Sequence, residues 1–336
     1  MSAPWKGSEV EAIGRFTLKR EFTTLGGGQS EWTIAATGDG AEHFLKRYIQ
    51  PVSPDPSLGL SEPTMQRLRD RVEYFRARQQ SIIGRLNEEQ FRRGVVGCTE
   101  FFEHERRFYK ATPLVDPIDP VLLVDCLPPD AASVLFASAD ALDYLHARSV
   151  VHGDVKPENV LMSRSESGAL NAHVIDLDEA YVEGYAPSRE EIVGTIGYYS
   201  PELAAFVSAR ADRDALTRAS GVFSLALTWV EMLTGRVPGF DRRHFRTTSQ
   251  AVENGATIEL DCCGQALTPL LADMLELAPY ERPSASEVLD RVGILDVETL
   301  LDGASRAVGP NPEPGIPDHT APDLMINLGR QTIGGR

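Results

Sequence analysis

The sequence predicts an α+β protein in two lobes, a small strand-rich lobe followed by a larger helical one. The chain has 336 residues, which is long for a single small domain. Apolar residues make up 42% of the chain, enough for a large core. Strand-like alternation occupies the first part of the chain, and helix-like spacing occupies most of the remainder.

The first predicted elements are strands. Residues 16–50 alternate apolar and polar side chains around Gly26, Gly27 and Gly28, a pattern typical of a hairpin followed by a strand at 42–48. Such a glycine run occurs in plain hairpin turns as well as in loops that cover phosphates, so it is not specific alone.

A helix and a second hairpin follow. Ser61-Glu62-Pro63 is a favourable helix start, and we expect the helix to extend to about residue 87. Residues 95–102 and 107–113 then have the pattern of two paired strands.

The rest of the chain is predicted to be helical up to a tail. Leu135, Ala139 and Leu142 recur at helical spacing. Further helices are expected at 222–233, 265–276 and 284–296, and the Gly- and Pro-rich composition after about residue 301 predicts a flexible tail. The expected divisions are an N-terminal extension, a strand-rich lobe, a helical lobe and the tail, at 1–15, 16–113, 114–298 and 299–336.

Charge and cysteine content exclude several classes of protein. The chain has 33 Lys and Arg against 49 Asp and Glu, a net charge of −16. This argues against nucleic-acid and membrane partners, because both attract basic surfaces. The four cysteines have no zinc-site spacing, and no segment has the pattern of a signal peptide or membrane span. We expect a cytoplasmic protein.

The densest polar cluster in apolar surroundings lies in residues 151–162. Asp154, Lys156 and Asn159 provide a carboxylate, a cation and an amide within six residues. That set suits phosphoryl transfer, in which a hydroxyl is oriented, charge is neutralised and a metal ion is held. Asp176 follows a buried-strand pattern and, with Asn159, could hold a hard cation through oxygen atoms.

This combination resembles the protein kinase superfamily, in particular bacterial eukaryotic-like Ser/Thr kinases. The loop from His152 to Asn159 is similar to the catalytic loop, and Asp176-Leu177-Asp178 stands where the family has Asp-Phe-Gly. Residues 194–202 resemble the end of the activation segment, with Ser-Pro-Glu for Ala-Pro-Glu. Arg282 matches a late arginine of the family, which predicts a buried ion pair with Glu202.

The resemblance covers about residues 16–296 and implies the bilobal protein-kinase-like fold and a role for each site residue. Asp154 would orient or accept the proton of the substrate hydroxyl, Lys156 would stabilise the transferring γ-phosphoryl group, and Thr195 would bridge them. Asn159 and Asp176 would hold Mg²⁺. Lys156 with Thr195 indicates transfer from ATP to Ser or Thr hydroxyls of a protein substrate.

In the strand-rich lobe the likeness is looser. Gly26, Gly27 and Gly28 would cover the phosphates, although Glu31 stands at the family's third glycine. Lys46 would contact the α- and β-phosphates. The chain has only five lysines, so a lysine kept here and at position 156 indicates sites that need a compact ammonium group.

The helix partner of Lys46 has two candidates. Glu73 is a carboxylate on the expected helix, whereas the apolar positions 82, 83 and 86 would place Gln79 there. We prefer Glu73, because Gln79 would leave Lys46 without its usual ion pair.

Three positions depart from the family pattern. Gly153 replaces the arginine that in many members reads a phosphate on the activation segment, so phosphorylation of that segment is not expected to be obligatory. Asp178 replaces a glycine, and Gly221 replaces an aspartate that braces the catalytic loop. We expect His152 to be a structural core residue.

Two other functions and one feature of the tail stay open. Glu31, Asp178, Gly221 and the uncertain helix carboxylate suit a pseudokinase that binds nucleotide or acts as a scaffold. The His-Gly-Asp sequence also occurs in small-molecule phosphotransferases of the aminoglycoside-kinase type, although Lys156 and Ser200-Pro201-Glu202 favour a protein substrate. In the tail, an apolar segment near Met325 could dock in trans, or Thr332 could accept phosphate through autophosphorylation.

Overall fold

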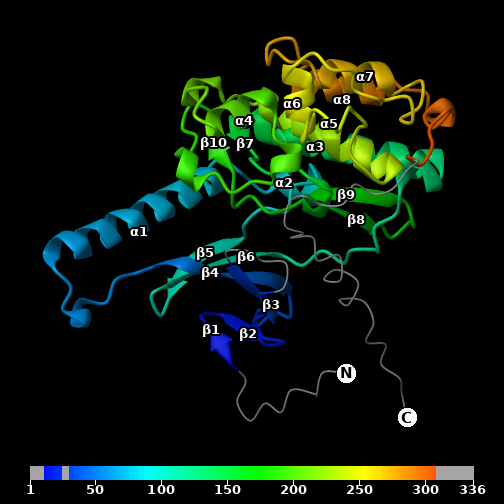
Figure 1. The fold of residues 1–336 in the computed structure, drawn as a ribbon. Coiled ribbons are helices and arrows are strands. Elements are labelled where there is room, and N and C mark those ends of the chain that lie inside the picture. The colour runs from blue at the N-terminus through cyan, green and yellow to red at the C-terminus, as the bar shows by residue number, and fades with distance from the viewer. Residues whose placement is uncertain (1–10, 25–29, 308–336) are drawn as a thin grey trace. The chain divides into compact units, whose positions relative to one another are not determined.

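The computed structural model describes residues 11–24 and 30–307 and divides them into two compact units (Figure 1). Unit 1 contains the described residues up to Ile83 together with Gly97–Asp116. Unit 2 contains Gly84–Val96 and the described residues from Pro117 onward. Unit 1 is rich in strands and unit 2 is mainly helical, which confirms the α+β class.

Unit 1 is an antiparallel sheet with one long helix. The strand order is β1-β2-β3-β4-β6-β5, in which most neighbours follow one another along the chain. Its elements are β1 Ala12–Ile13, β2 Phe16–Leu18, β3 Ser30–Ala36, β4 Glu42–Val52, α1 Glu62–Ile83, β5 Glu100–His104 and β6 Arg107–Pro113. The predicted hairpin, following strand, helix and second hairpin are all present.

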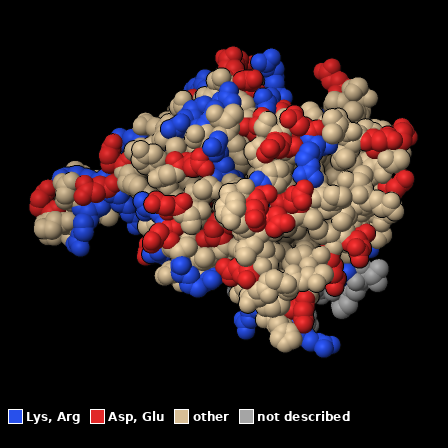
Figure 2. Space-filling view, turned by 90° about the horizontal axis from the view of Figure 1, so that it is seen from above, with Lys and Arg blue, Asp and Glu red and all other residues tan. Residues whose placement is uncertain are grey.

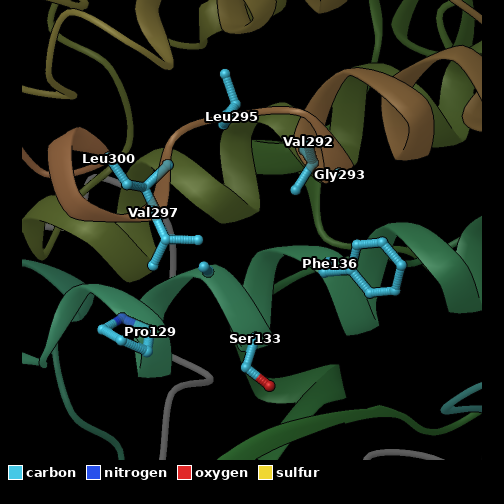
Figure 3. Close-up of a pocket in the computed structure, with 9 residues that line it drawn as sticks. Pro129, Ser133, Phe136, Val292, Gly293, Leu295, Val297 and Leu300 are labelled. Atoms are coloured by element: carbon cyan, nitrogen blue, oxygen red, sulfur yellow. The ribbon is translucent and has the colours of Figure 1, made fainter.

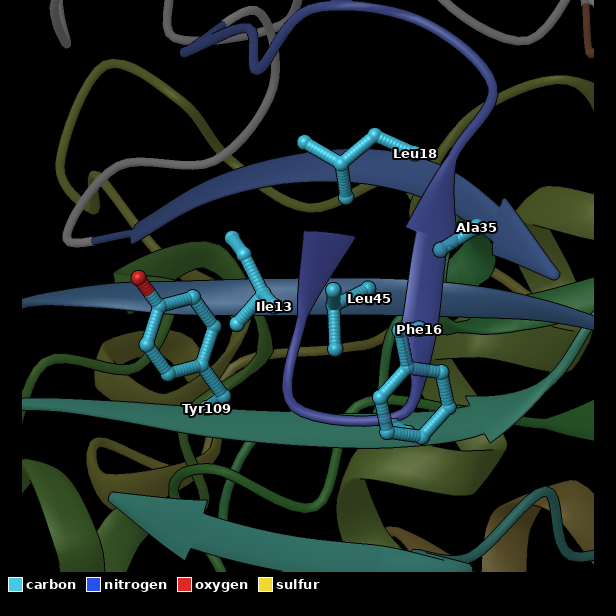
Figure 4. Packing of buried hydrophobic residues seen from close by; sticks show 7 residues of the cluster. Ile13, Phe16, Leu18, Ala35, Leu45 and Tyr109 are labelled. Atoms are coloured by element: carbon cyan, nitrogen blue, oxygen red, sulfur yellow. The ribbon is translucent and has the colours of Figure 1, made fainter. Parts of the chain in front are cut away.

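The sheet has an apolar cluster on one face (Figure 4). Phe16, Leu45 and Tyr109 pack together there with four other apolar side chains from β1, β2, β3 and β6. Residues at successive strand positions point to opposite faces, so Tyr48 and Phe108 belong to a second cluster. Aromatic and aliphatic side chains of α1 join that second cluster and attach the helix to the sheet.

Unit 2 contains most of the helices and two short antiparallel ribbons, β7–β10 and β8–β9. Its helices are α2 Glu89–Arg92, α3 Pro128–His146, α4 Pro201–Val207, α5 Ala219–Thr234, α6 Thr248–Glu253, α7 Thr268–Met274 and α8 Ala285–Gly293. Its strands are β7 Val150–Val151, β8 Val160–Arg164, β9 Leu170–Val174 and β10 Tyr181–Val182. Short 3-10 turns connect several of these elements.

Helix α5 forms the centre of unit 2. All of its residues except Ala219 and Glu231 are buried, as expected for a helix that is apolar on every side. The indole of Trp229 is fully buried and donates a hydrogen bond to Ser138 of α3 at 2.9 Å. This contact ties the two longest helices of the unit together.

One predicted strand is shorter than expected. The sequence pattern suggested pairing from residue 95, whereas β5 begins at Glu100. Val95 and Val96 instead pair beside Val174, whose carbonyl accepts the Val96 N–H at 2.9 Å. The apolar run is therefore divided between the two units. Val95 and Val96 extend the β8–β9 ribbon of unit 2, and the residues from Glu100 onward form β5 of unit 1.

Acidic and basic side chains are interspersed on the face seen in Figure 2. Among the residues that the structure describes, no helix is both long enough and apolar enough to cross a membrane.

Candidate active site

The candidate site is built on the loop that leaves β7. The strand is buried, and His152 directly after it is fully buried as well. The Nε2 of His152 lies 2.9 Å from the carbonyl of Ile175, and the N–H of Asp154 donates to Nδ1 at 3.3 Å. Burial lowers the pKa of His152, so the neutral ring uses one nitrogen as donor and the other as acceptor. His152 is thus a structural residue that holds the loop.

The carboxylate of Asp154 is held from three sides. Its Oδ2 lies 2.8 Å from the ammonium of Lys156 and accepts from the amide of Asn159 at 3.2 Å. Its Oδ1 accepts the backbone N–H of Thr195 at 2.8 Å. The two oxygens therefore have fixed directions, and the ammonium lies beside them.

Thr195 comes from the activation segment and reaches both partners. Its hydroxyl accepts a hydrogen bond from Lys156 at 2.7 Å, while its N–H bonds Asp154. The preceding Gly194 permits this close approach, since a Cβ there would lie 3.0 Å from the carbonyl of Gly153. The Tyr199 hydroxyl donates to the Gly194 carbonyl at 2.7 Å and fixes the turn.

The two predicted metal ligands lie at the same end of the β8–β9 ribbon. The N–H of Ile175 donates to the carbonyl of Asn159 at 3.0 Å, which places Asp176 next to Asn159 across the ribbon. The amide nitrogen of Asn159 bonds the Asp154 carbonyl at 2.7 Å and thereby directs the amide oxygen away from the loop. Asp176 is exposed and has a left-handed φ of 59°. An amide oxygen beside a carboxylate fits a small divalent cation.

Gly153 occupies a place that no side chain fits. Its φ is +85°, a conformation that favours glycine, and a Cβ would lie 2.4 Å from the carbonyl oxygen of Glu179. The substitution of glycine for the family's arginine is therefore part of how this loop packs against the segment after Asp178.

The predicted ion pair between Glu202 and Arg282 is confirmed. The guanidinium bonds both carboxylate oxygens, at 2.7 and 2.9 Å, and Ser220 adds a third hydrogen bond to the carboxylate. Arg282 also donates to the carbonyls of Glu276 and Leu277. Burial by itself would raise the pKa of Glu202, but its bonds to Arg282 and Ser220 hold that pKa below its ordinary value.

Gly221 lies beside a buried histidine. A Cβ at Gly221 would be 3.0 Å from Nε2 of His146, a nitrogen that has no hydrogen-bond partner within the described residues. Burial lowers the pKa of His146 to about 3, and the charges of Arg218 and His152 act in the same direction. The site of the expected bracing aspartate is therefore filled by a neutral imidazole.

In unit 1, the structure locates only part of the expected nucleotide site. Gly26, Gly27 and Gly28 lie outside the described residues. Lys46 lies in β4, where it pairs in register with Trp32 of β3 and Lys110 of β6.

The preference for Glu73 over Gln79 differs from what the structure shows. Glu73 is 72% exposed, and its carboxylate lies 3.9 Å from Arg76. Gln79 is buried, because it shares the helix face of Val72 seven positions earlier, whereas Glu73 is turned about 100° away from that face. Gln79 accepts a hydrogen bond from the buried ammonium of Lys110 at 3.4 Å.

Two polar contacts of the site region were not predicted. Lys110 is one of the chain's five lysines, so the scarcity that drew attention to Lys46 and Lys156 could have drawn attention to it. The Tyr198 hydroxyl donates to Glu231 of α5, and burial raises the pKa of both groups. Glu231 sits in an apolar helix, and its lone charge there was the available signal.

The fold and this loop define a domain with the layout of a phosphotransferase. The family model for the protein kinase domain matches residues 82–292, and the chain belongs to this family. The matched region contains Asp154, Lys156, Asn159, Asp176 and Thr195. It begins after most of α1.

Curated relatives include kinases from distant organisms. The chain is 30% identical over 165 residues to a calcium and calcium/calmodulin-dependent serine/threonine-protein kinase of Oryza sativa, covering 48% of this chain and 30% of that one. It is 28% identical over 179 residues to Aurora/IPL1-related protein kinase 2 of Caenorhabditis briggsae, covering 53% of each chain. It is 29% identical over 204 residues to serine/threonine-protein kinase PknH of Mycobacterium tuberculosis, covering 59% of this chain and 29% of that one. These matches span between about a third and a half of each relative.

Proposed function

We propose that this chain is an active Ser/Thr protein kinase that transfers the γ-phosphate of ATP, with Mg²⁺, to a protein hydroxyl. The observation that carries the proposal is the arrangement around Asp154, whose carboxylate is held by Lys156, Asn159 and Thr195. Such a preorganised group is what general-base positioning of a hydroxyl requires.

Each residue has one task in this proposal. Asp154 accepts a hydrogen bond from the incoming hydroxyl and takes its proton as the new phosphorus–oxygen bond forms, while the bond from the γ-phosphorus to the bridging oxygen breaks and ADP leaves. The ammonium of Lys156, 2.8 Å from Asp154, attracts the negative charge of the transferring phosphoryl group. Thr195 keeps both side chains in position, because it bonds each of them.

Asn159 and Asp176 would hold the metal through an amide and a carboxylate oxygen. Mg²⁺, when bound, would neutralise phosphate charge. In unit 1 the proposal assigns Lys46, Gly26, Gly27 and Gly28 to the phosphates of ATP.

Transfer of radiolabel from γ-labelled ATP tests the proposal. Wild-type protein should label a protein substrate or itself, and Asp154→Asn should lower the rate by at least a hundredfold, since the amide cannot take the proton. The control is Glu166→Gln, an exposed acid in the β8–β9 turn, which should retain the wild-type rate. Equal labelling by wild type and Asp154→Asn would refute the enzyme proposal.

A pseudokinase is the second candidate, and the neutral imidazole of His146 beside Gly221, where the family has a bracing aspartate, is the observation that favours it. Nucleotide binding by the wild type with no transfer to proteins or to small alcohols would establish this alternative. Transfer to small alcohols without protein labelling would instead indicate a small-molecule phosphotransferase.

We further propose that activation-segment phosphorylation is not obligatory. The support is the site of Gly153, which has no room for an arginine that would read a phosphate, together with contacts of Thr195 that need no phosphate. Phosphatase-treated and untreated protein should phosphorylate a substrate at initial rates within about twofold of each other. A tenfold loss on phosphatase treatment would contradict the proposal.

A further inference from the structure

An apolar groove lies on the surface of unit 2, between α3 and the segment that follows α8 (Figure 3). Pro129 and Phe136 form its α3 side, and Leu295, Val297 and Leu300 form the other. Its volume is about 250 Å³. Small-molecule sites usually exceed roughly 300 Å³ and contain several convergent polar groups, so the groove suits a few apolar side chains of a peptide better than a cofactor.

The walls of the groove include apolar side chains that water reaches. Phe136 is 45% exposed and Val297 is 36% exposed. Covering such side chains is favourable by about 25 cal/mol for each Å² of apolar surface removed from water. A chain segment that covers Phe136 and Val297 would therefore gain part of this free energy.

We propose that residues 324–328 of the same chain, Leu-Met-Ile-Asn-Leu, dock in this groove. They lie outside the described residues, and their composition is the first reason to assign them. Within residues 308–336, this is the one window of five residues that contains four large apolar side chains. The preceding residues 308–323 are rich in Pro and Gly and act as a connection.

The connection has the right length. The last described residues are anchored near the groove, because Arg306 pairs with Asp125 at 2.5 Å. Asp125 is four residues before Pro129, so at most about 15 Å of chain separates them. The 16 residues from 308 to 323 can extend over roughly 50–58 Å, so they are long enough to bridge this distance. A tether longer than its span still raises the effective concentration of the segment at the groove, by an amount that falls as the tether lengthens.

Charge favours the same occupant. The exposed carboxylates of Asp296 and Glu298 lie on either side of Val297 in the sequence, at the edge of the groove. Residues 324–336 contain no Asp or Glu, but contain Arg330 and Arg336, in a chain whose net charge is −16. Opposite charges on the segment and the groove edge attract within a Debye length of about 8–10 Å.

Photo-crosslinking in the full chain tests the proposal. A benzophenone amino acid at position 326 should form adducts with residues 129–136 and 292–300, and the same probe at Ile316 should not. Leu328→Asp should reduce the adduct yield at least fivefold without affecting the folded body. Val297→Asp should do the same from the groove side, and Ile294→Asp, at a neighbouring residue that is 83% exposed, is the matched control that should leave the yield unchanged.

Isotope labelling separates docking within one chain from docking between two. In an equal mixture of ¹⁴N and ¹⁵N protein, adducts within one chain contain a single isotope. Mixed-isotope adducts would assign the groove to a second copy and overturn the proposal. The proposal would also be overturned by equal adduct yields from probes at positions 316 and 326, or by adducts outside the groove. An unchanged yield in both Leu328→Asp and Val297→Asp would overturn it as well.

Discussion

At the scale of single residues, the glycines and histidines around the catalytic loop decide its shape. Gly153 allows a backbone approach that no side chain permits, and Gly194 allows one that a side chain would crowd. His152 and His146 are buried and hold neutral rings next to that loop. The loop therefore depends on small and neutral residues as much as on the charged ones that carry the proposed chemistry.

Gly153→Ala should destabilise the protein more than a glycine substitution at a similar φ elsewhere. The left-handed backbone costs a non-glycine residue about 1–2 kcal/mol, and the contact at 2.4 Å from the Glu179 carbonyl adds to that cost. Gly168→Ala is the matched control, because its φ is +86° and its Cβ would touch nothing within 4 Å. Urea denaturation measures the unfolding free energy of both variants, Gly153→Ala and Gly168→Ala. Equal losses of unfolding free energy would show that the Glu179 contact carries no energy.

His146 should make stability fall as the pH is lowered. The folded state keeps its imidazole neutral with a pKa of about 3, whereas the unfolded chain takes up a proton near the ordinary value of 6.5. The unfolding free energy attributable to His146 therefore decreases by about 1.4 kcal/mol for each pH unit below 6.5. Between pH 7 and pH 5 the unfolding free energy attributable to His146 should fall by about 2 kcal/mol. The variant His146→Leu should lack this pH-dependent decrease.

Denaturation midpoints of the wild type and of His146→Leu, each measured at pH 7 and pH 5, give the pH-dependent part of the stability that His146 contributes. His152 is intact in both proteins, so its titration contributes to both measurements. A His146→Leu protein with the same pH dependence as the wild type would contradict this explanation.

At the scale of elements, buried polar contacts join the segments that carry the site. The ion pair between Glu202 of α4 and Arg282 connects the end of the activation segment to the loop before α8. The hydroxyl of Tyr198 connects the same segment to α5 through Glu231. Thr195 is thereby presented to the catalytic loop by a segment attached at its C-terminal end to the core of unit 2.

Arg282→Ala should destabilise the protein by about 3–5 kcal/mol, because it leaves the buried Glu202 carboxylate without its partner. The folded-state pKa of Glu202 is lowered, so the contribution of this pair is present above the unfolded pKa near 4.5 and is lost as the pH falls through the folded value. Arg306→Ala removes an exposed ion pair and should destabilise the protein far less. Thermal and urea denaturation at pH 7 measure the stability loss in each variant. Similar losses in Arg282→Ala and Arg306→Ala would refute the prediction that the buried ion pair contributes more than the exposed one.

At the scale of the whole molecule, an acidic chain is proposed to bind an acidic ligand. The net charge of −16 repels ATP at long range, so binding depends on a few placed cations and on the metal. Lys46 and Lys156 supply the cations in this proposal, and Asn159 with Asp176 supplies the metal ligands.

Mg-ATP should therefore stabilise the whole chain, and the effect should depend on the metal. At a ligand concentration a hundred times the dissociation constant, the stabilisation is about 2.7 kcal/mol, a shift of several degrees in melting temperature. Removing Mg²⁺ with a chelator, or introducing Asp176→Ala, should eliminate most of the shift. Glu166→Gln should leave it intact. A shift of equal size with and without metal in the wild type would argue against the assigned metal ligands.

Much of the fold was predictable because its patterns are local. The alternation within residues 16–50 and the apolar spacing of residues 135–145 appear in the structure as β2, β3, β4 and α3. The strand expected from residue 95 was too long, because Val95 and Val96 pair with Val174 almost eighty residues away. A pairing at that separation leaves no local pattern in the sequence.

The site residues that are close together along the chain were predictable. The residues whose burial depends on how a helix is rotated about its axis were less predictable. Asp154, Lys156 and Asn159 lie on one loop, so their spacing alone brings them together. Glu73 and Gln79 lie on one helix, and only its packing against the sheet determines which of the two is buried. Weak apolar patterning of α1 made the choice depend on tertiary contacts.

The sequence by itself determined the family, the order of strands and helices and the short loop of reacting groups, because each is encoded in neighbouring residues. Tertiary structure alone decided that Gln79 rather than Glu73 is buried and that Gly153 has no room for a side chain. It also decided that His146 occupies the space beside Gly221. These outcomes depend on atoms from segments far apart along the chain, whose contacts arise only when both segments pack against a common core.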